Sequence, residues 1–163
     1  MKQLVIATLM VVILSTSACF RDIDNTFNEY KVVELEDAVK RTPASGLTYP
    51  VISLTKTAGT QTLVANLVGE KLTADQDMTF SIDTAIYTQL NATTIRGEAG
   101  THFNLNGGKF TIKQDSSFAS LKFDVINTTV TGKSVFFVLK LDGSTDIKPS
   151  ENYRRVGFKI NLN

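Results

Sequence analysis

The sequence predicts an all-β protein whose strands form an antiparallel sandwich. Two observations lead to this prediction: apolar and polar residues alternate with a period of two, and glycine-containing turns separate the alternating runs. Successive side chains of a strand point to opposite faces, so such a run has one buried and one solvated face. About eight short strands joined by glycine turns favour a two-sheet sandwich of the immunoglobulin type, with a β-barrel as the alternative.

Composition narrows the possible functions. The chain has 163 residues, enough for one domain, with 17 basic and 16 acidic residues, one histidine, one cysteine and no tryptophan. A single cysteine excludes a disulfide framework, and one histidine leaves no ligand set for zinc or haem. The near-zero net charge gives no attraction to nucleic acid. We therefore expect no cofactor, no metal and no nucleic-acid partner.

The first 18 residues have the features of a signal peptide. Lys2 precedes an apolar run, Leu4 to Leu14, and small residues follow up to Ala18. Eleven helical residues rise about 16 Å, roughly half of a bilayer's hydrocarbon core, so the run is too short to span it. A positive start, a short apolar run and small residues before a cleavage site are typical of secretory signals.

The segment Ser15-Thr16-Ser17-Ala18-Cys19 resembles a bacterial lipobox, with Thr16 where leucine is commoner. The resemblance implies that Cys19 is lipidated and becomes the first mature residue. Each buried methylene of its acyl chains would contribute about 0.8 kcal/mol to membrane binding. Residues 19–29 are then a polar tether, and its acidic residues resemble surface-export signals of Bacteroidetes lipoproteins. We expect an outer-membrane lipoprotein with a domain over residues 30–163, facing either the periplasm or the cell surface.

Alternation predicts the strands of this domain in order. Leu63 to Val68 and Val135 to Leu139 are apolar at successive positions, which indicates central strands or strands covered by a loop. Helical spacing is limited to single turns at Leu35 to Lys40 and at Ile86 to Leu90. The remaining strands are expected at Tyr30–Glu36, Tyr49–Leu54, Asp77–Asp83, Lys109–Lys113, Ser120–Val125 and Arg155–Leu162.

Several of these segments, in this order, resemble the Calx-beta-like sandwich domains of unknown function in Bacteroidetes lipoproteins. They are Val32–Glu36, Leu63–Gly69, Asp77–Ile82, Ala99–Phe103 and Gly108–Ile112. Such proteins accompany polysaccharide-uptake systems, so the resemblance implies an accessory role in glycan capture. It assigns no binding residue. Calx-beta domains hold calcium with clustered loop carboxylates, and the sequence shows no such cluster.

Residues with catalytic or metal-binding chemistry are few. The sequence contains no Gly-x-Ser-x-Gly motif whose serine His102 could activate as a base, so we interpret His102 as a structural residue. The loop Asp142–Asp146 has oxygen side chains at alternate positions, but Ile147 and Tyr153 stand where a calcium-binding EF-hand needs glycine and glutamate. A surface loop is the better interpretation, and Asp75 and Asp77 are expected to be solvated strand carboxylates.

Exposed aromatic rings would indicate sugar binding, because pyranose C–H groups stack on flat rings. Of Tyr30, Tyr49, Tyr87 and Tyr153, the last two are the candidate ligand-binding residues, although packing is the better explanation for tyrosines in a strand protein. Arg154-Arg155 is expected at a solvated strand start. The sequence thus predicts a non-enzymatic, lipid-anchored module that binds a glycan or a partner protein. The alternative is a structural or assembly subunit of a surface adhesin or fibre.

Overall fold

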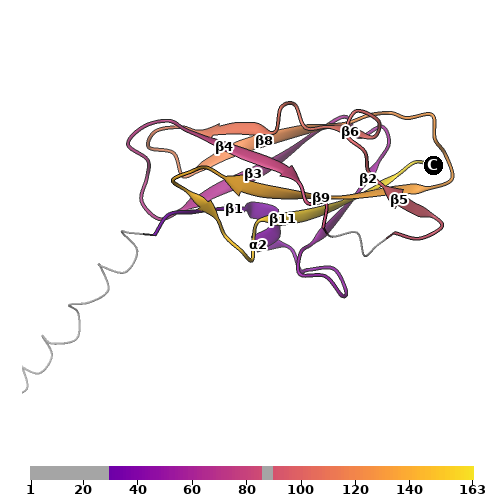
Figure 1. Ribbon diagram of the computed structural model, residues 1–163, viewed down its shortest axis with the longest axis horizontal. Helices are drawn as coiled ribbons and strands as arrows, with labels where there is room; N and C mark the ends of the chain where they lie inside the picture. The colour runs from indigo at the N-terminus through magenta and orange to yellow at the C-terminus, as the bar shows by residue number, and fades with distance from the viewer. Residues whose placement is uncertain (1–29, 86–89) are drawn as a thin grey trace, which may run out of the picture.

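Two β-sheets pack face to face in the computed structural model, which describes residues 30–85 and 90–163 (Figure 1). The five-stranded sheet has the order β10 (Lys148–Pro149), β1 (Val32–Leu35), β3 (Thr60–Val68), β8 (Phe118–Val125) and β6 (Phe103–Asn104). The six-stranded sheet has the order β2 (Val51–Thr55), β11 (Arg155–Asn161), β9 (Ser134–Gly143), β4 (Gln76–Ile82) and β7 (Lys109–Ile112). Its sixth strand, β5 (Thr94–Arg96), pairs with β9.

The predicted sandwich is confirmed, and each of the eight expected runs contains a strand. Two of them start later than expected, at Val32 and Val51. Three further strands, β5, β6 and β10, have only two or three residues each. Most pairs are antiparallel, but β1–β10, β2–β11 and β5–β9 are parallel. The chain crosses from the five-stranded to the six-stranded sheet between β1 and β2.

The core between the sheets contains the inward residues of the alternating strands. Phe137 on β9 stacks between Phe103 and Phe158, with ring centroids 4.1 and 5.3 Å away. Phe123 meets the rings of Phe137 and Phe158 edge-on. All four rings are almost fully buried. Edge-to-face and offset contacts of this kind add about 0.5–1.5 kcal/mol per pair to the burial of the rings.

Strand β9 is buried on both faces, as its unbroken apolar run predicts. Val135, Phe137 and Leu139 point into the core, whereas Phe136 and Val138 lie on the outer face of the six-stranded sheet. There they pack with Tyr49 in a second apolar cluster, which the half-buried Leu47 and Val51 extend. The strand is therefore both central and covered by a loop, namely the α2–β2 loop formed by residues 41–50.

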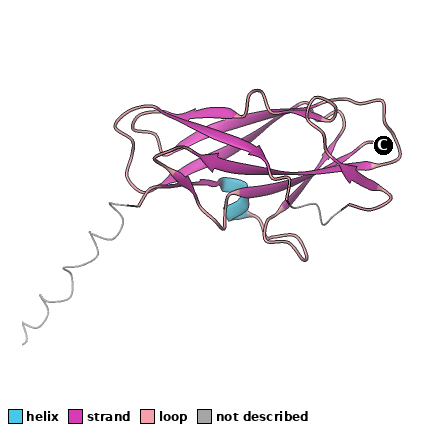
Figure 2. Cartoon of the chain, viewed as in Figure 1, coloured by secondary structure: helices cyan, strands magenta, loops and turns pink. Residues whose placement is uncertain are grey.

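One short helix, α2 (Glu36–Lys40), follows β1 and is the turn predicted at Leu35 to Lys40 (Figure 2). Ala38 is its buried residue. Its exposed side is stabilised by two i,i+4 pairs, Lys40–Glu36 and Arg41–Asp37, each 2.6 Å long. Such exposed pairs contribute a few tenths of a kcal/mol. The helix turns the chain away from β1 and into the α2–β2 loop.

The two ends of the described chain lie at opposite ends of the sandwich. The segment leading into β1 is at one end of the long axis, and the C-terminus is at the other (Figure 1). The expected signal peptide at residues 1–18, the lipidated Cys19, the tether at residues 19–29, and Tyr87 with most of its predicted turn lie outside the described residues. Within the described ranges, no helix has the length and apolarity needed to cross a membrane.

Candidate functional site

Tyr153 lies in a hollow beside the outer face of the six-stranded sheet. The hollow has a volume of about 480 Å³. Tyr153 is 40% exposed. Tyr49, another of the aromatic candidates, is 2% exposed and packs in the outer cluster. The other residues that line the hollow come from two loops and the first residue of β11: Pro43, Thr48, Glu151, Asn152 and Arg155.

The α2–β2 loop forms one wall of this hollow and is held down by Tyr49. The backbone carbonyl of Tyr49 accepts a hydrogen bond from the Ala44 N–H at 3.1 Å, which closes the loop on itself. Its ring packs over β11 at Gly157, where a β-carbon would lie 3.1 Å from Cε2 of Tyr49. Glycine in a strand marks a place where another segment approaches closely. The loop and the strand are therefore fitted to each other.

The β10–β11 loop forms the opposite wall and is tied to β1 through the backbone. The Ser150 N–H donates to the Val33 carbonyl at 2.8 Å, and the Leu35 N–H donates to the Tyr153 carbonyl at 2.9 Å. These bonds fix the backbone on both sides of Asn152. The loop is therefore held in place by backbone hydrogen bonds, which do not involve the side chain of Tyr153.

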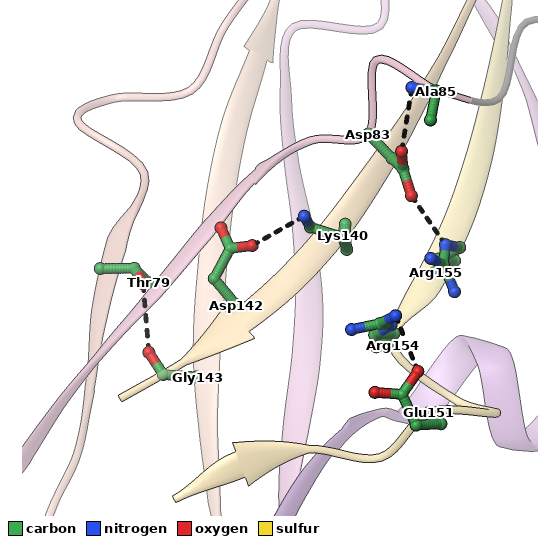
Figure 3. A network of polar contacts seen from close by, with 9 residues as sticks. All are labelled: Thr79, Asp83, Ala85, Lys140, Asp142, Gly143, Glu151, Arg154 and Arg155. Carbon is green, nitrogen blue, oxygen red and sulfur yellow. Dashed lines mark hydrogen bonds and ion pairs between the residues drawn. The ribbon is translucent and has the colours of Figure 1, made fainter. Parts of the chain in front are cut away.

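Asp83 and Arg155 form an ion pair at the edge of the hollow (Figure 3). The Nε of Arg155 donates to Oδ2 of Asp83 at 2.8 Å, and the backbone N–H of Ala85 donates to Oδ1 at 3.1 Å. Burial raises the pKa of Asp83, but these bonds, with the charges of Arg155 and Lys140, outweigh it and hold the pKa below its ordinary value. The pair joins the residue that follows β4 to the first residue of β11 and is largely shielded from solvent.

A second ion pair neutralises the other charged residue of the hollow. Glu151 accepts a bond from a terminal nitrogen of Arg154 at 2.7 Å (Figure 3). Both charged lining residues are therefore compensated. Among the described residues, the side chains of Thr48 and Asn152 have no hydrogen-bond partner, and Arg155 uses only its Nε. The hollow thus offers an aromatic ring and uncommitted polar groups without a net charge.

Two buried polar atoms have no partner within residues 30–85 and 90–163: the hydroxyl of Tyr49 and the Nε of Arg154. Burial raises the pKa of Tyr49, the charge of Asp83 raises it further, and Arg155 opposes this. An unsatisfied buried hydroxyl costs about 1–3 kcal/mol. The ring of Tyr49 therefore stabilises the outer cluster through packing, whereas its buried, unpaired hydroxyl opposes that stabilisation.

The other candidates from the sequence are structural or lie outside the described residues. His102 is 5% exposed, and its Nδ1 accepts a hydrogen bond from the Glu98 N–H at 3.1 Å. That bond closes the loop before β6, in agreement with a structural role. Tyr87 and Cys19 lie outside the described residues. Tyr30 is 70% exposed and does not line the hollow of Tyr153.

The acidic loops are organised by internal hydrogen bonds. In the β9–β10 loop, the Ser144 hydroxyl accepts bonds from the backbone N–H groups of Asp146 and Ile147. Asp75 pairs with Lys113 at 2.7 Å, and Asp77 accepts a bond from the Thr111 hydroxyl at 2.7 Å. No group of three or more histidine, cysteine, aspartate or glutamate residues gathers in the described part of the chain.

Sequence reasoning missed most of the hollow. Arg155 was expected at a solvated strand start, but its side chain is only 22% exposed because Asp83 pairs with it. Thr48 and Asn152 carried no pattern that distinguishes them from other loop residues. Two signals did point to this face: the outward apolar residues Phe136 and Val138, which need a cover, and a glycine, Gly157, inside a regular strand.

Comparison with known proteins identifies the fold. No family model matches the sequence, and no curated protein matches it. The apo form of the Calx CBD1 domain matches with a TM-score of 0.56 and 13% identity, over 82% of this chain and 97% of that domain. The two sheets are therefore arranged as in a Calx-beta domain, in agreement with the resemblance seen in the sequence.

Two Bacteroides proteins contain a similar domain within longer chains. A candidate carbohydrate-binding protein from Bacteroides ovatus matches with a TM-score of 0.56 and 10% identity, over 80% of this chain and 36% of that one. The Bacteroides thetaiotaomicron protein EndoBT-3987, solved with a Man5GlcNAc product, matches with a TM-score of 0.52 and 14% identity, over 79% of this chain and 30% of that one. The present chain thus corresponds to about a third of each protein, and these likenesses concern the fold.

Proposed function

We propose that this chain is a lipid-anchored, non-enzymatic protein of the cell envelope that binds a glycan in the hollow of Tyr153. It would serve as an accessory module of an outer-membrane uptake system. The observation that carries the proposal is the half-exposed ring of Tyr153 in a hollow whose remaining polar groups are uncommitted. Two Bacteroides proteins with this fold, one a candidate carbohydrate-binding protein, support the choice of ligand class.

The chemistry of the hollow suits a saccharide. A pyranose ring has apolar C–H faces that stack on an aromatic ring and hydroxyls that need hydrogen-bond partners around its rim. Tyr153 supplies the ring, and Thr48, Asn152 and the terminal nitrogens of Arg155 supply donors and acceptors. A concave site of this kind favours a small ligand over a partner protein, which would need a broader contact surface.

The residues of the hollow support binding without hydrolysis. Most glycosidases need two carboxyl groups that flank the scissile bond. Among the described residues that line the hollow, Glu151 alone is acidic, and it is engaged by Arg154. Asp83 is bound by Arg155 and by the Ala85 N–H. Neither carboxylate is arranged as a general acid or nucleophile.

Anchoring at Cys19 would place the membrane at the end of the sandwich where β1 begins. The tether from residue 19 to residue 29 would separate the sandwich from the lipid surface. Without Lys2, 16 basic residues balance 16 acidic ones, so the domain has no net charge that draws it onto anionic lipids. We therefore expect the sandwich to project from the membrane with its hollow accessible from the side.

The alternative, a structural or assembly subunit, would require long exposed sheet edges to which other chains can add strands. The edge strands of the five-stranded sheet, β10 and β6, have two residues each. Those of the six-stranded sheet, β2 and β7, have five and four. Strand β8, however, pairs with β6 only at Asp124 and Val125, so on that side its residues 118–123 form a further edge without a partner strand among the described residues. We favour the binding module because of the hollow of Tyr153 rather than because of the length of the edges.

The test is glycan binding by the purified protein and by variants of the hollow. An oligosaccharide array should identify ligands, and calorimetry should then compare the wild type with Tyr153→Ala on the best of them. We expect a loss of up to about tenfold for Tyr153→Ala, since aromatic contacts contribute about 0.5–1.5 kcal/mol and about 1.4 kcal/mol corresponds to tenfold in affinity. The fold should persist because the backbone of Tyr153 is held by its bonds to Ser150 and Leu35.

Tyr30→Ala is the matched control, because Tyr30 is the most exposed of the described tyrosines and does not line the hollow. It should bind like the wild type. Asn152→Ala and Thr48→Val should each weaken binding with a smaller effect than Tyr153→Ala. Equal losses in both tyrosine variants, or no array ligand at all, would refute the proposal.

A further inference from the structure

A second, smaller hollow lies on the same face of the six-stranded sheet and differs from the first in charge. Its volume is about 180 Å³. Leu47, Val51 and Phe136 of the outer cluster give it an apolar floor, and Asn91, Thr94 and Lys159 give it polar groups. None of the described residues that line it is acidic. It is therefore suited to a ligand with both an apolar face and hydrogen-bond acceptors.

The polar groups that remain available in this second hollow are mainly donors. Oδ1 of Asn91 already accepts bonds from the backbone N–H and the hydroxyl of Thr93, both at 2.9 Å, which leaves the amide nitrogen of Asn91 for a ligand. Lys159 has no ion-pair partner among the described residues. Its ammonium group donates and cannot accept. This arrangement favours an anionic acceptor, such as the carboxylate of an acidic sugar.

The α2–β2 loop contributes to both hollows. Pro43 and Thr48 line the first hollow, whereas Ala44 and Leu47 line the second. Arg155 and Lys159 point outward from β11 four residues apart, so their Cα atoms are separated by roughly 13 Å. The α2–β2 loop, with the ring of Tyr49 over Gly157, lies between the two hollows. A ligand that occupies both must therefore pass around this loop and must be an oligosaccharide, because a single sugar is too short.

We propose that the second hollow binds an anionic group of the same ligand, so that the glycan is an acidic oligosaccharide with a sugar at Tyr153 and a carboxylate or sulfate at Lys159. The inference rests on the proposed glycan-binding function. The first hollow, whose charged residues are paired, binds an uncharged sugar of the oligosaccharide. The second, whose lysine is unpaired within the described residues, selects for negative charge.

Polygalacturonate and its fully methyl-esterified form test this directly, because they share the same rings and differ in charge. Chondroitin sulfate and alginate extend the test to sulfate groups and to other linkages. We expect the full mature protein to bind at least one acidic polymer about tenfold or more tighter than the neutral ester, with an affinity that falls as salt rises. Lys159→Gln should abolish this preference, and Lys159→Arg should retain most of it.

Lys122→Gln is the matched control, since Lys122 is an exposed lysine on β8 of the opposite sheet. It should leave the preference unchanged. The proposal is overturned if no acidic polymer binds better than the neutral ester, or if Lys159→Gln and Lys122→Gln behave alike. Binding of neutral glycans that depends on Tyr153, without acidic preference, would leave the proposed function intact. A preference for acidic polymers that depends on Lys159 but not on Tyr153 would mean that the glycan binds in the second hollow rather than in the hollow of Tyr153, which would contradict the proposed function.

Discussion

The ring of Tyr49 lies across Gly157, so that a β-carbon on Gly157 would lie 3.1 Å from Cε2 of Tyr49 and 3.0 Å from Cγ2 of Val51. This contact couples the α2–β2 loop to β11. Both hollows take residues from that loop and from that strand. The position of a glycine inside a strand thus determines whether the walls of the candidate site can form.

Gly157→Ala should therefore loosen the α2–β2 loop. The new methyl group forces its aromatic and aliphatic neighbours to shift by a few tenths of an ångström, and overpacking of this kind costs about 1–3 kcal/mol. Denaturant unfolding should show that loss. Hydrogen exchange at the amides of Ala44 and Leu47, which are bonded within the loop, should become faster.

Gly100→Ala provides the comparison for that substitution. Gly100 has a φ of +81°, and no atom lies within 4 Å of the place that a β-carbon would take, so alanine there meets backbone strain but no neighbour. Strain at such a φ costs about 1–3 kcal/mol. The two variants should thus lose comparable stability, but the exchange rates of Ala44 and Leu47 should rise in Gly157→Ala alone. Equal rates in both would show that Tyr49 does not depend on Gly157.

Tyr49→Phe should leave stability unchanged or raise it by up to about 1 kcal/mol. The hydroxyl has no partner in the described structure, so its removal ends the cost of burying it while the ring still fills the outer cluster. Tyr49→Ala should instead cost about 3–5 kcal/mol, as for other large aromatic truncations. Unfolding curves of the two variants give the comparison. A large loss in Tyr49→Phe would mean that the hydroxyl is bonded in solution.

The same residue has a spectroscopic signature. Because burial and the charge of Asp83 raise the pKa of Tyr49, its phenol should ionise at higher pH than an ordinary tyrosine. Absorbance titration of the folded protein should therefore show one late-titrating tyrosine. That late phase should disappear in Tyr49→Phe and persist in Tyr30→Phe. A titration in which all tyrosines ionise together would contradict the burial of Tyr49.

These variants also show what could be predicted from the sequence. Alternation indicated most of the strands and their inward residues, because a period of two depends only on local order, and unbroken apolar runs indicated β3 and β9. The outward Phe136 and Val138 correctly indicated a cover over β9. The cover itself, Tyr49, was placed in a strand, since its pattern resembles an edge strand and only the packing on Gly157 reveals its position.

Contacts between distant segments could not be predicted in this way. Asp83 and Arg155 are 72 residues apart, and periodicity assigns each to a face without saying which residues of that face meet. The strands β5, β6 and β10 are too short to show a period. Of the two tyrosines named as binding candidates, Tyr153 lies in a hollow, and Tyr87 lies outside the described residues.

Asp83→Asn should lower stability at neutral pH by about 1.5–3 kcal/mol, the range for hydrogen bonds to a charged group. The folded-state pKa of Asp83 is depressed, so its contribution is fully present above the unfolded pKa, near the ordinary 3.8, and is lost as pH falls through the folded value. The difference between wild type and variant should be constant above about pH 5 and shrink below pH 4. Urea unfolding at several pH values measures it.

Asp146→Asn is the control for that series, because Asp146 is exposed on the β9–β10 loop and its carboxylate makes no bond to any described residue. It should match the wild type at neutral pH. If the deficit of Asp83→Asn persists undiminished at low pH, the shape of the side chain rather than its charge supports β4 and β11.

Cys19→Ser tests the lipid anchor on which the proposed location depends. A serine hydroxyl does not replace the thiol that accepts the lipid, and in a lipoprotein the cut before this residue follows lipidation. In cells given a labelled fatty acid, the wild type should carry label and migrate as the mature chain. The variant should remain unlabelled and keep residues 1–18.

Thr16→Leu, which brings the segment closer to the lipobox pattern, should be labelled and cut at least as well as the wild type. Normal cleavage of Cys19→Ser would mean that the segment is an ordinary secretory signal, and the sandwich would then be released rather than held at the membrane.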